Sequence, residues 1–568
     1  MLKRLILTLA LTSSWAWAAP ADDRFAQIAS NFLEGYLRSN PETATVLGDH
    51  RYDGEWSNVS REGVERNLTF ARELLGRLES LPASELSREN AIDRDMLIHH
   101  LKGQLWSAGE LKEWQWNPLV YNPGPAIFAL VARDYAPITQ RLEAVALRLE
   151  ALPAYLQQAR AELVNPPPLH CQTAIAQNNG TIAFLEHDLE EFLKQAPEKR
   201  ARVESARRVA VQALRDYGTW LEKDLLPRSH GDFRLGRERW RKKLYFTLES
   251  SLTAEELRAR AEKDLARTHQ EMTRVARPLY ASLMGRSADK LSDSEVCRAV
   301  LNRLAQDRPD SHTIVPQAGD SLKKATEFVR EHKLVSLPEE PCQIIEMPEF
   351  NRGVAIAYCD SPGPLETGGT TYYAIAPTPS DWSAERSLSF YREYNNAMLD
   401  DLTVHEAMPG HFLQLMHANH FQAPTKVRAI LQSGTFVEGW ATYAEQMMVA
   451  NGYGGPAVHM QQLKMRLRLI LNALLDQKVH TGQLSEEEGV RWLMQAGFQE
   501  EGEATAKWRR ACLTSAQLST YYVGNCEVND LVTSYRQAHP GESWQKVHDQ
   551  ILAFGSPAPR YIARLLKP

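Results

Sequence analysis

The segment TVHEAMPGHFLQ, residues 403–414, contains two histidines and a glutamate in an order that indicates a metal site. In the motif H-E-x-x-H, one helical turn brings two histidines to the same face, where they bind zinc, and the glutamate acts as the base. Here His411 follows His405 by six positions, which on a regular helix is a rotation of roughly 600°, or about 240° around the axis. A regular helix would therefore point the two imidazoles apart.

Pro409 and Gly410 lie between the two histidines. Proline has no amide hydrogen to donate to the carbonyl of residue 405, and its ring crowds that carbonyl. Glycine permits backbone angles that other residues avoid. We therefore predict that the helix widens or breaks here, as helices do at π-type bulges near functional sites, and that one enlarged turn returns His411 to the metal.

A third ligand is needed, because zinc in hydrolases usually has three protein ligands of N and O type and leaves one position for water. The segment GTFVEGWATYAE, residues 434–445, supplies Glu438, which we predict as that ligand. Glu445 lies seven positions later on nearly the same helix face, and we expect it to orient one of the histidines. His417 and His420 are weaker alternatives for the third ligand and are more typical of a helix surface or of ordinary packing.

Glu406 follows the first histidine directly. At a metal site it is predicted to accept a proton from the activated water and to pass it to the leaving amine. Ligation by two imidazoles and a carboxylate favours Zn²⁺, although cobalt and manganese stay open.

The composition is that of a globular protein, with 43% hydrophobic and 24% charged residues and a net charge of -6. This slightly acidic balance gives no electrostatic footprint for nucleic acid. The 568 residues suffice for several ordinary domains or for one large helical enzyme. No G-x-S-x-G elbow and no glycine-rich phosphate loop is present.

The N-terminus is typical of a secretory signal peptide, predicted over residues 1–18. Lys3 and Arg4 precede the apolar run 5–11, and the small-x-small sequence AWA at 16–18 predicts cleavage after Ala18. No cysteine stands at that point, so we expect no lipid anchor there, and no later segment is apolar enough to span a membrane. The expectation is an exported protein, periplasmic or secreted.

Helical periodicity dominates an N-terminal region predicted over residues 19–335. Leucines of ELLGRLESL fall on one face, and a capping box, Thr253 with Glu256, is predicted to open a further helix. A second face with the same spacing comprises Leu142, Val145, Leu149 and Leu152.

The catalytic region is predicted over residues 336–568. Short β-branched and aromatic runs bounded by glycine and proline predict a small sheet at its start. Helical patterning resumes near Ala384. The predicted fold is therefore mainly α, with a small mixed β-sheet beside the metal-site helices. The predicted strands lie in CQIIEM (342–347), GVAIAYC (353–359) and TTYYAIAP (370–377).

Six cysteines fit an oxidising compartment, and six allow fifteen pairings. Proximity in sequence favours Cys342 with Cys359 and Cys512 with Cys526. Buried free thiols are an equally open alternative.

Four motifs resemble, in order, a bacterial family known as domain of unknown function 885. They are HEAMPGHFLQ (405–414), FVEGWATYAE (436–445), LLDQKVHTG (474–482) and QLSTYYVG (517–524). The resemblance covers most of the chain, most strongly after residue 340. It implies a large helical metallopeptidase-like fold of the zinc peptidases whose third ligand is Glu, and FVEGWATYAE is also similar to a helix of thimet-oligopeptidase-like enzymes.

The resemblance places His405, His411 and Glu438 at the metal positions and Glu406 at the catalytic one. Two departures are visible. Phe412 stands where many relatives have a further histidine, which removes that position as a ligand, and Ser515 replaces a proline common in relatives.

Tyr521 is the candidate for donating a hydrogen bond to the tetrahedral oxyanion, with Tyr522 as a second candidate at the substrate. His480 stands four residues after Asp476, a spacing that allows a carboxylate to orient the imidazole for substrate binding or catalysis. For these side chains, packing between helices with the polar atoms satisfied is the alternative.

The run TTYYAIAP is a candidate edge strand that pairs with an extended peptide, so that Tyr372 and Tyr373 border the cleft. A plain sheet interior is the alternative.

The leading hypothesis is a zinc-dependent peptidase with its cleft between an N-terminal helical wall and the C-terminal motifs. Short or unfolded peptides as substrates are implied by the resemblance. The alternatives are a non-catalytic peptide-binding protein of the cell envelope and a metal-dependent amidase or esterase acting on a small molecule. The intact Glu406 argues against the first, whereas the motif does not identify the bond attacked. The sequence does not indicate an oligomeric state.

Overall fold

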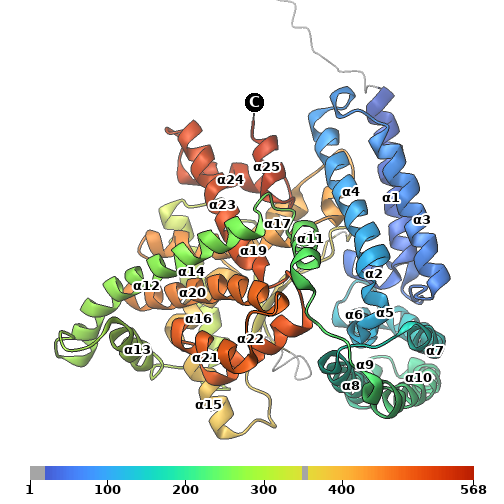
Figure 1. Ribbon diagram of the computed structural model, residues 1–568, viewed down its shortest axis with the longest axis horizontal. Helices are drawn as coiled ribbons and strands as arrows, with labels where there is room; N and C mark the ends of the chain where they lie inside the picture. The colour runs from blue at the N-terminus through green and yellow to red at the C-terminus, as the bar shows by residue number, and fades with distance from the viewer. Residues whose placement is uncertain (1–19, 348–355, 367, 568) are drawn as a thin grey trace, which may run out of the picture.

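A computed structural model describes residues 20–347, 356–366 and 368–567. As predicted, the fold is mainly α with one small sheet (Figure 1). The predicted signal peptide and the first residues of the run GVAIAYC lie outside the described residues. Among the described helices, none combines the length and apolar character that crossing a membrane requires.

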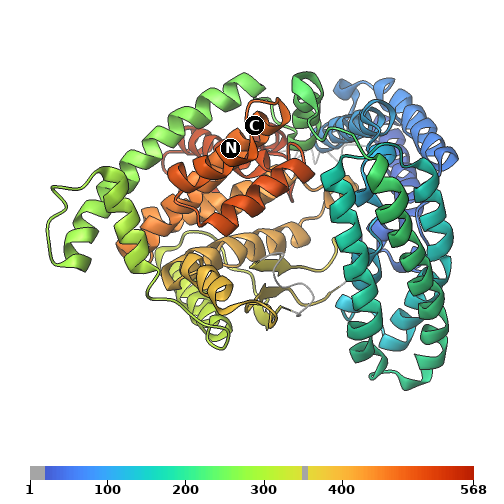
Figure 2. The ribbon, with the colours of Figure 1, turned by 60° about the horizontal axis from the view of Figure 1, so that its bottom comes forward.

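The first ten helices form an N-terminal lobe, shown in blue and teal in Figure 2. The apolar stripe predicted around Leu142 and Leu149 is buried where α7 packs on α10. The helices are α1 (Pro20–Ser39), α2 (Pro41–Leu47), α3 (Arg61–Glu79), α4 (Arg88–Trp106), α5 (Glu113–Trp116), α6 (Gly124–Ala132), α7 (Ile138–Glu162), α8 (Pro168–Ala183), α9 (Leu189–Leu193) and α10 (Arg200–Trp220).

Four further helices precede the sheet, and three of them pack on the C-terminal region rather than on the N-terminal lobe. Helix α12 lies along α20, and α14 lies against α16 (Figures 1 and 2). The capping box predicted at Thr253 and Glu256 opens α12. Helices α12 and α14 thus pack across the boundary predicted between residues 335 and 336. The four are α11 (Gly236–Leu248), α12 (Ala254–Met284), α13 (Asp293–Leu304) and α14 (Ile314–His332).

The sheet is mixed, with the strand order β1-β3-β2. Strand β3 pairs in parallel with β1 and antiparallel with β2. Both of its edges are occupied, so the prediction that TTYYAIAP is an edge strand open to a peptide is wrong. The strands are β1 (Gln343–Glu346), β2 (Ala357–Asp360) and β3 (Tyr372–Ile375).

The C-terminal helices surround the predicted metal site. Helix α19 packs closely on α23, where a Cβ on Gly439 would lie 2.5 Å from the backbone of Gly524. Only glycines allow this approach, which fixes the position of α19. The helices are α15 (Ala384–Glu393), α16 (Asn396–Glu406), α17 (His411–His420), α18 (Val427–Ile430), α19 (Gly434–Ala450), α20 (Gly455–His480), α21 (Glu486–Ala496), α22 (Glu501–Leu513), α23 (Ser519–Ala538), α24 (Trp544–Leu552) and α25 (Pro559–Leu565).

All six cysteines are free thiols, so neither favoured disulfide is formed. Cys342 precedes β1 and Cys359 lies in β2, and β3 separates these strands. Cys512 and Cys526 pack into different hydrophobic clusters on α22 and α23.

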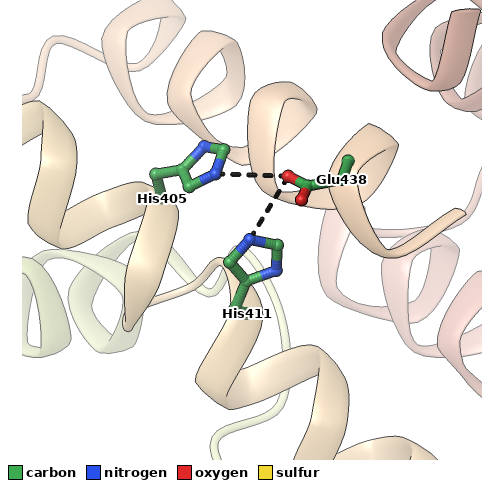
Figure 3. A group of neighbouring side chains, drawn as sticks. All are labelled: His405, His411 and Glu438. Atoms are coloured by element: carbon green, nitrogen blue, oxygen red, sulfur yellow. Dashed lines mark ion pairs between the residues drawn. The ribbon is translucent and has the colours of Figure 1, made fainter. Parts of the chain in front are cut away.

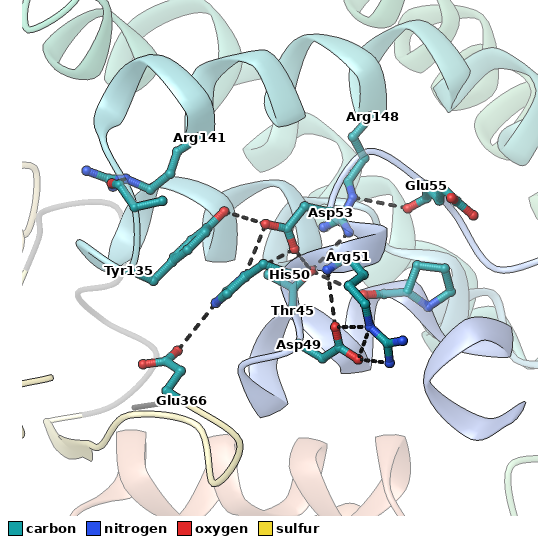
Figure 4. A network of polar contacts seen from close by, with 12 residues as sticks. Thr45, Asp49, His50, Arg51, Asp53, Glu55, Tyr135, Arg141, Arg148 and Glu366 are labelled. Atoms are coloured by element: carbon teal, nitrogen blue, oxygen red, sulfur yellow. Dashed lines mark hydrogen bonds and ion pairs between the residues drawn. The ribbon is translucent and has the colours of Figure 1, made fainter. Parts of the chain in front are cut away.

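A polar network joins the N-terminal lobe to the segment between β2 and β3 (Figure 4). Asp53 is buried and accepts hydrogen bonds from the hydroxyls of Thr45 (2.7 Å) and Tyr135 (2.6 Å). The imidazole of His50 stacks on the Tyr135 ring, with 3.5 Å between centroids. Its Nδ1 lies 3.1 Å from Asp53, and its Nε2 lies 3.8 Å from Glu366.

We expect this network to make folding stability depend on pH. Burial acts to lower the pKa of His50, but the carboxylates of Asp53 and Glu366 outweigh it and raise that pKa from 6.5 to about 9. A raised folded-state pKa contributes stability that is complete below pH 6.5 and is lost as the pH rises through 9. Between pH 6.5 and pH 9, the unfolding temperature should fall less for His50→Gln than for the unaltered protein.

The exposed His230 provides the matched control. His230→Gln should keep the pH dependence of the unaltered protein. An identical pH profile for His50→Gln would show that this imidazole does not stabilise the junction.

Candidate metal centre

The segment between the two histidines is a break in the helix rather than a bulge. Helix α16 ends at Glu406, the Met408–Pro409 peptide is cis, and α17 begins at His411. The N–H of Gly410 donates to the carbonyl of Val404 (2.9 Å), which closes a tight turn. The distortion predicted from the proline and the glycine is therefore confirmed, and the second imidazole starts a new helix.

Two close contacts hold this turn. A Cβ on Gly410 would lie 1.9 Å from the carbonyl oxygen of His405, so no larger residue fits there. The indole Nε1–H of Trp440, on α19, donates to the carbonyl of Pro409 (2.9 Å). The turn is thereby bound to the helix that carries the predicted third ligand.

The structure brings His405, His411 and Glu438 together (Figure 3). Glu438 Oε2 lies 3.5 Å from Nε2 of each histidine, and the three candidate ligand atoms lie within 4.8 Å of one another. The imidazole rings are nearly perpendicular, at 88°, and both histidines are 8% exposed. Within the described part of the chain, these residues form the one such group of histidine, cysteine or acidic side chains.

These distances fit a metal ion better than direct hydrogen bonds. Two ligands with bonds of about 2.1 Å to a tetrahedral ion lie about 3.4 Å apart. Glu438 Oε2 is buried and forms no hydrogen bond within the described residues, although it faces both imidazoles. A buried carboxylate oxygen without a hydrogen bond is costly unless something else satisfies it. The donor set of two nitrogens and one oxygen suits zinc.

Glu445 lies behind the first histidine. Its Oε1 is 2.6 Å from Nδ1 of His405, an arrangement that holds the proton on Nδ1 and leaves the Nε2 lone pair facing Glu438. Burial opposes a charge on His405, but Glu438 and Glu445 outweigh it and raise the pKa of the imidazole. A proton therefore competes with a metal ion for Nε2.

Glu406 is the last residue of α16 and is partly exposed. Within the described residues its carboxylate forms no hydrogen bond or ion pair. Glu406 follows His405 directly in the chain. The candidate centre therefore has an adjacent carboxylate that is not used in a hydrogen bond or an ion pair among the described residues.

Tyr521 also lies near the group. It is partly exposed on α23, and burial, followed by the charge of Glu438, raises the pKa of its phenol. Arg510 Nη2 donates to the Tyr521 hydroxyl (3.4 Å) and to Gln517 Oε1 (3.0 Å). Sequence reasoning missed Arg510, which lies seven residues before Gln517, the first residue of the QLSTYYVG motif.

The structure places the other predicted catalytic pair elsewhere. His480 is 1% exposed, and its Nε2–H donates to the carbonyls of Ala511 (2.9 Å) and Thr514 (2.7 Å). Asp476 is fully buried and accepts from the hydroxyl of Ser519 (2.8 Å). Both side chains connect helices away from His405, His411 and Glu438. His480 also lines the cavity of about 290 Å³ beside α22, but its Nε2–H is already bonded to two carbonyls, so the predicted catalytic role of the pair is corrected to a structural one.

Two of the three predicted substrate tyrosines are also buried. Tyr373 is 0% exposed, with its hydroxyl 3.2 Å from that of Thr403. Tyr522 is 0% exposed and donates to Asp264 (2.9 Å). They do not border a cleft, because β3 is the central strand and this face of α23 packs on α12. Tyr372 is partly exposed and remains a candidate.

The alternative third ligands lie outside the group. His417 Nε2 bonds to the carbonyl of Ser336 (3.0 Å), and the exposed His420 lies 2.8 Å from Glu340.

The fold and the site define a helical protein in which two buried histidines meet a partly buried glutamate. The chain belongs to the family described as "Bacterial protein of unknown function (DUF885)", whose model matches residues 41–566.

Two solved structures have the same fold. A proposed lipoprotein of unknown function from Shewanella oneidensis has a TM-score of 0.81 and 29% identity, covering 95% of this chain and 99% of that chain. A proposed lipoprotein from Colwellia psychrerythraea has a TM-score of 0.77 and 15% identity, with coverage of 96% and 98%.

A more distant structure is an M32 carboxypeptidase from Deinococcus radiodurans, with a TM-score of 0.36 and 11% identity over 95% of this chain and 93% of that one. No curated protein matches this chain.

We predict that Gly410→Ala disrupts the centre, because the added methyl group would overlap the His405 carbonyl and move one imidazole. Overpacking of this kind costs about 1–3 kcal/mol of folding stability. The zinc content after dialysis should fall, and so should the denaturant concentration at the midpoint of unfolding. Gly502→Ala on α22, where nothing lies within 4 Å, is the control and should keep both. Full zinc binding by Gly410→Ala would contradict the close contact.

We predict that Glu445→Gln weakens zinc binding about 10- to 100-fold, because an amide holds His405 less firmly than a carboxylate. Competition with a chromogenic chelator measures this affinity. Glu406→Gln, which leaves the three candidate ligands intact, should bind zinc like the unaltered protein. Equal affinities for all three proteins would rule out a supporting role for Glu445.

Proposed function

We propose that this protein is an exported zinc-dependent peptidase acting on short or unfolded peptides. The observation that carries the proposal is the meeting of His405, His411 and Glu438 beside the unpaired carboxylate of Glu406. A site with three protein ligands and an adjacent free base is the arrangement found in hydrolytic zinc enzymes.

In this proposal His405, His411 and Glu438 would hold a zinc ion, which would act as a Lewis acid that polarises a carbonyl and lowers the pKa of water. Glu406 accepts the proton of the attacking water and later delivers it to the leaving amine. Tyr521 receives a hydrogen bond from Arg510, which leaves its own O–H free to donate to the oxyanion.

Two cavities of about 380 and 290 Å³ lie between the N-terminal lobe and the C-terminal region, and both are lined by Lys243 and Thr247 of α11. The candidate ligands and Glu406 are not among the residues that line them. We propose these cavities as space for side chains of a peptide substrate.

Export is supported by the signal-like N-terminus and by the two related proteins named as proposed lipoproteins. Ala19, and not a cysteine, follows the expected cleavage site in this chain.

We expect Glu406→Gln to lower peptide hydrolysis about 10²- to 10⁴-fold, the usual contribution of a general base. Because the introduced amide is uncharged and similar in size to the carboxylate, zinc content should stay unchanged. Digestion of a mixed peptide library, followed by mass spectrometry, measures the activity, with zinc analysis of the same samples.

Three outcomes separate the hypotheses. Zinc-dependent cleavage lost in Glu406→Gln supports the peptidase. Peptide binding that a chelator leaves unchanged, without turnover, indicates a non-catalytic binding protein. Zinc bound without any peptide cleavage contradicts the peptidase and leaves an amidase or esterase acting on a small molecule.

A further inference from the structure

Arg510 is an exposed residue in the last turn of α22. Both of its hydrogen-bond partners, Gln517 Oε1 and the hydroxyl of Tyr521, are uncharged. These contacts fix the direction of the guanidinium but leave its charge uncompensated.

Neighbouring cations differ from Arg510 in this respect. Lys507, one turn earlier on α22, lies 3.6 Å from Glu503. Lys243, on α11, lies 2.5 Å from Glu113. No carboxylate of the described residues forms an ion pair with Arg510. Arg509, the preceding residue, also bonds only an uncharged group, the Thr173 hydroxyl (3.0 Å). Of these two arginines, Arg510 is the one beside Tyr521, and its charge is available to an anionic ligand there.

The packing of α19 on α23 locates Arg510 relative to the metal centre. The two helices run in the same direction, since Gly434 lies beside Thr520 and Gly439 lies beside Gly524. Glu438 is thus level with the turn of α23 that carries Tyr521. The phenol of Tyr521 therefore lies between the guanidinium of Arg510 and the candidate metal ligands.

Space for a ligand lies on the other side of Gln517. This residue lines the cavity of about 290 Å³ between the N-terminal lobe and α22. Trp116 and Phe233 give the cavity aromatic walls, and Lys243 in it is already paired. Arg510 therefore stands between the metal centre and a cavity near the lower end of the range for ligand pockets.

We propose that Arg510 binds the C-terminal carboxylate of the substrate, so that the protein removes residues from the free C-terminus of a peptide. This inference rests on the proposed function, because it assigns the scissile bond to the adjacent metal centre. A guanidinium matches a carboxylate with two parallel N–H donors, and capture of a terminal carboxylate is a recurring mode of peptide recognition. The last side chain of the peptide faces the aromatic cavity.

The test uses a library of N-acetylated pentapeptides prepared both as free acids and as C-terminal amides. The zinc-loaded protein should cleave the free acids with a kcat/KM about tenfold to a hundredfold higher, mainly through KM, as the loss of a charge-assisted hydrogen bond implies. Arg510→Gln should remove the preference, so that free acids and amides are cleaved with the same kcat/KM; because the variant also loses the hydrogen bond to Tyr521, the ratio of the two rates is the readout and not the rate of the amides alone. Arg510→Lys should keep part of the preference.

Arg491→Gln is the matched control, because Arg491 is an exposed arginine on the neighbouring helix α21, paired only with Glu487 at 3.5 Å. The Arg491→Gln variant should keep the full preference for free acids over amides. Equal cleavage of acids and amides, or an equal loss of both in Arg510→Gln, would overturn the assignment of Arg510.

A binding measurement separates failure of this inference from failure of the proposed function. Calorimetry with zinc-loaded Glu406→Gln should show tighter binding of free acids than of amides, and the double variant with Arg510→Gln should lose that difference. If no peptide is cleaved but this difference is present, the peptidase proposal fails and the carboxylate site stands. If acids and amides bind equally, or neither binds, the carboxylate site is refuted.

Discussion

The candidate metal centre depends on the contact between the Pro409–Gly410 turn and helix α19. Two candidate ligands come from either side of this turn, and the third comes from α19, so the hydrogen bond from Trp440 to the Pro409 carbonyl sets their relative positions. Gly410 is needed for the turn to close against His405. Helix α19 is in turn fixed by its glycine contact with α23, which also carries Tyr521. Small residues and one indole therefore align side chains from three helices.

Local chemistry explains what the sequence could predict. Periodicity identified the buried stripe of α7, and the chemistry of Pro409 identified the break that brings two imidazoles together. Predictions failed where the answer depended on distant partners. Contacts with α12 and α22, which are distant in the sequence, bury the side chains of Tyr522 and His480. Strand β3 is the central strand because β1 and β2 both pair with it. Arg510 was missed because an arginine without an acidic partner has no signature in the sequence.

The carboxylates around the candidate metal centre have no arginine or lysine partner among the described residues, which favours binding of a cation. Glu438, Glu445 and Asp401 are gathered within the same part of the core, and each has one buried oxygen without a hydrogen bond in the described structure. Burial raises the pKa of Glu445 and of Asp401, and the charge of Glu445 adds to the effect on Asp401. Histidines are the only basic side chains that form ion pairs with these carboxylates among the described residues.

Two other buried carboxylates of the same protein, Glu393 and Asp93, are compensated by permanent cations. Glu393 is held by Lys464 (2.7 Å) and Arg468 (2.5 Å), and Asp93 is held by Arg428 (2.5 Å). A buried charge without a partner costs several kcal/mol, and at these two carboxylates an arginine or a lysine offsets it. The buried Asp53 and Asp476 have a histidine as their ion-pair partner, but both oxygens of each accept hydrogen bonds. At the centre between α16 and α19, by contrast, Glu438 Oε2 faces two imidazoles and accepts no hydrogen bond within the described residues. A divalent ion would satisfy that oxygen, and this difference supports a metal site over a structural ion-pair cluster.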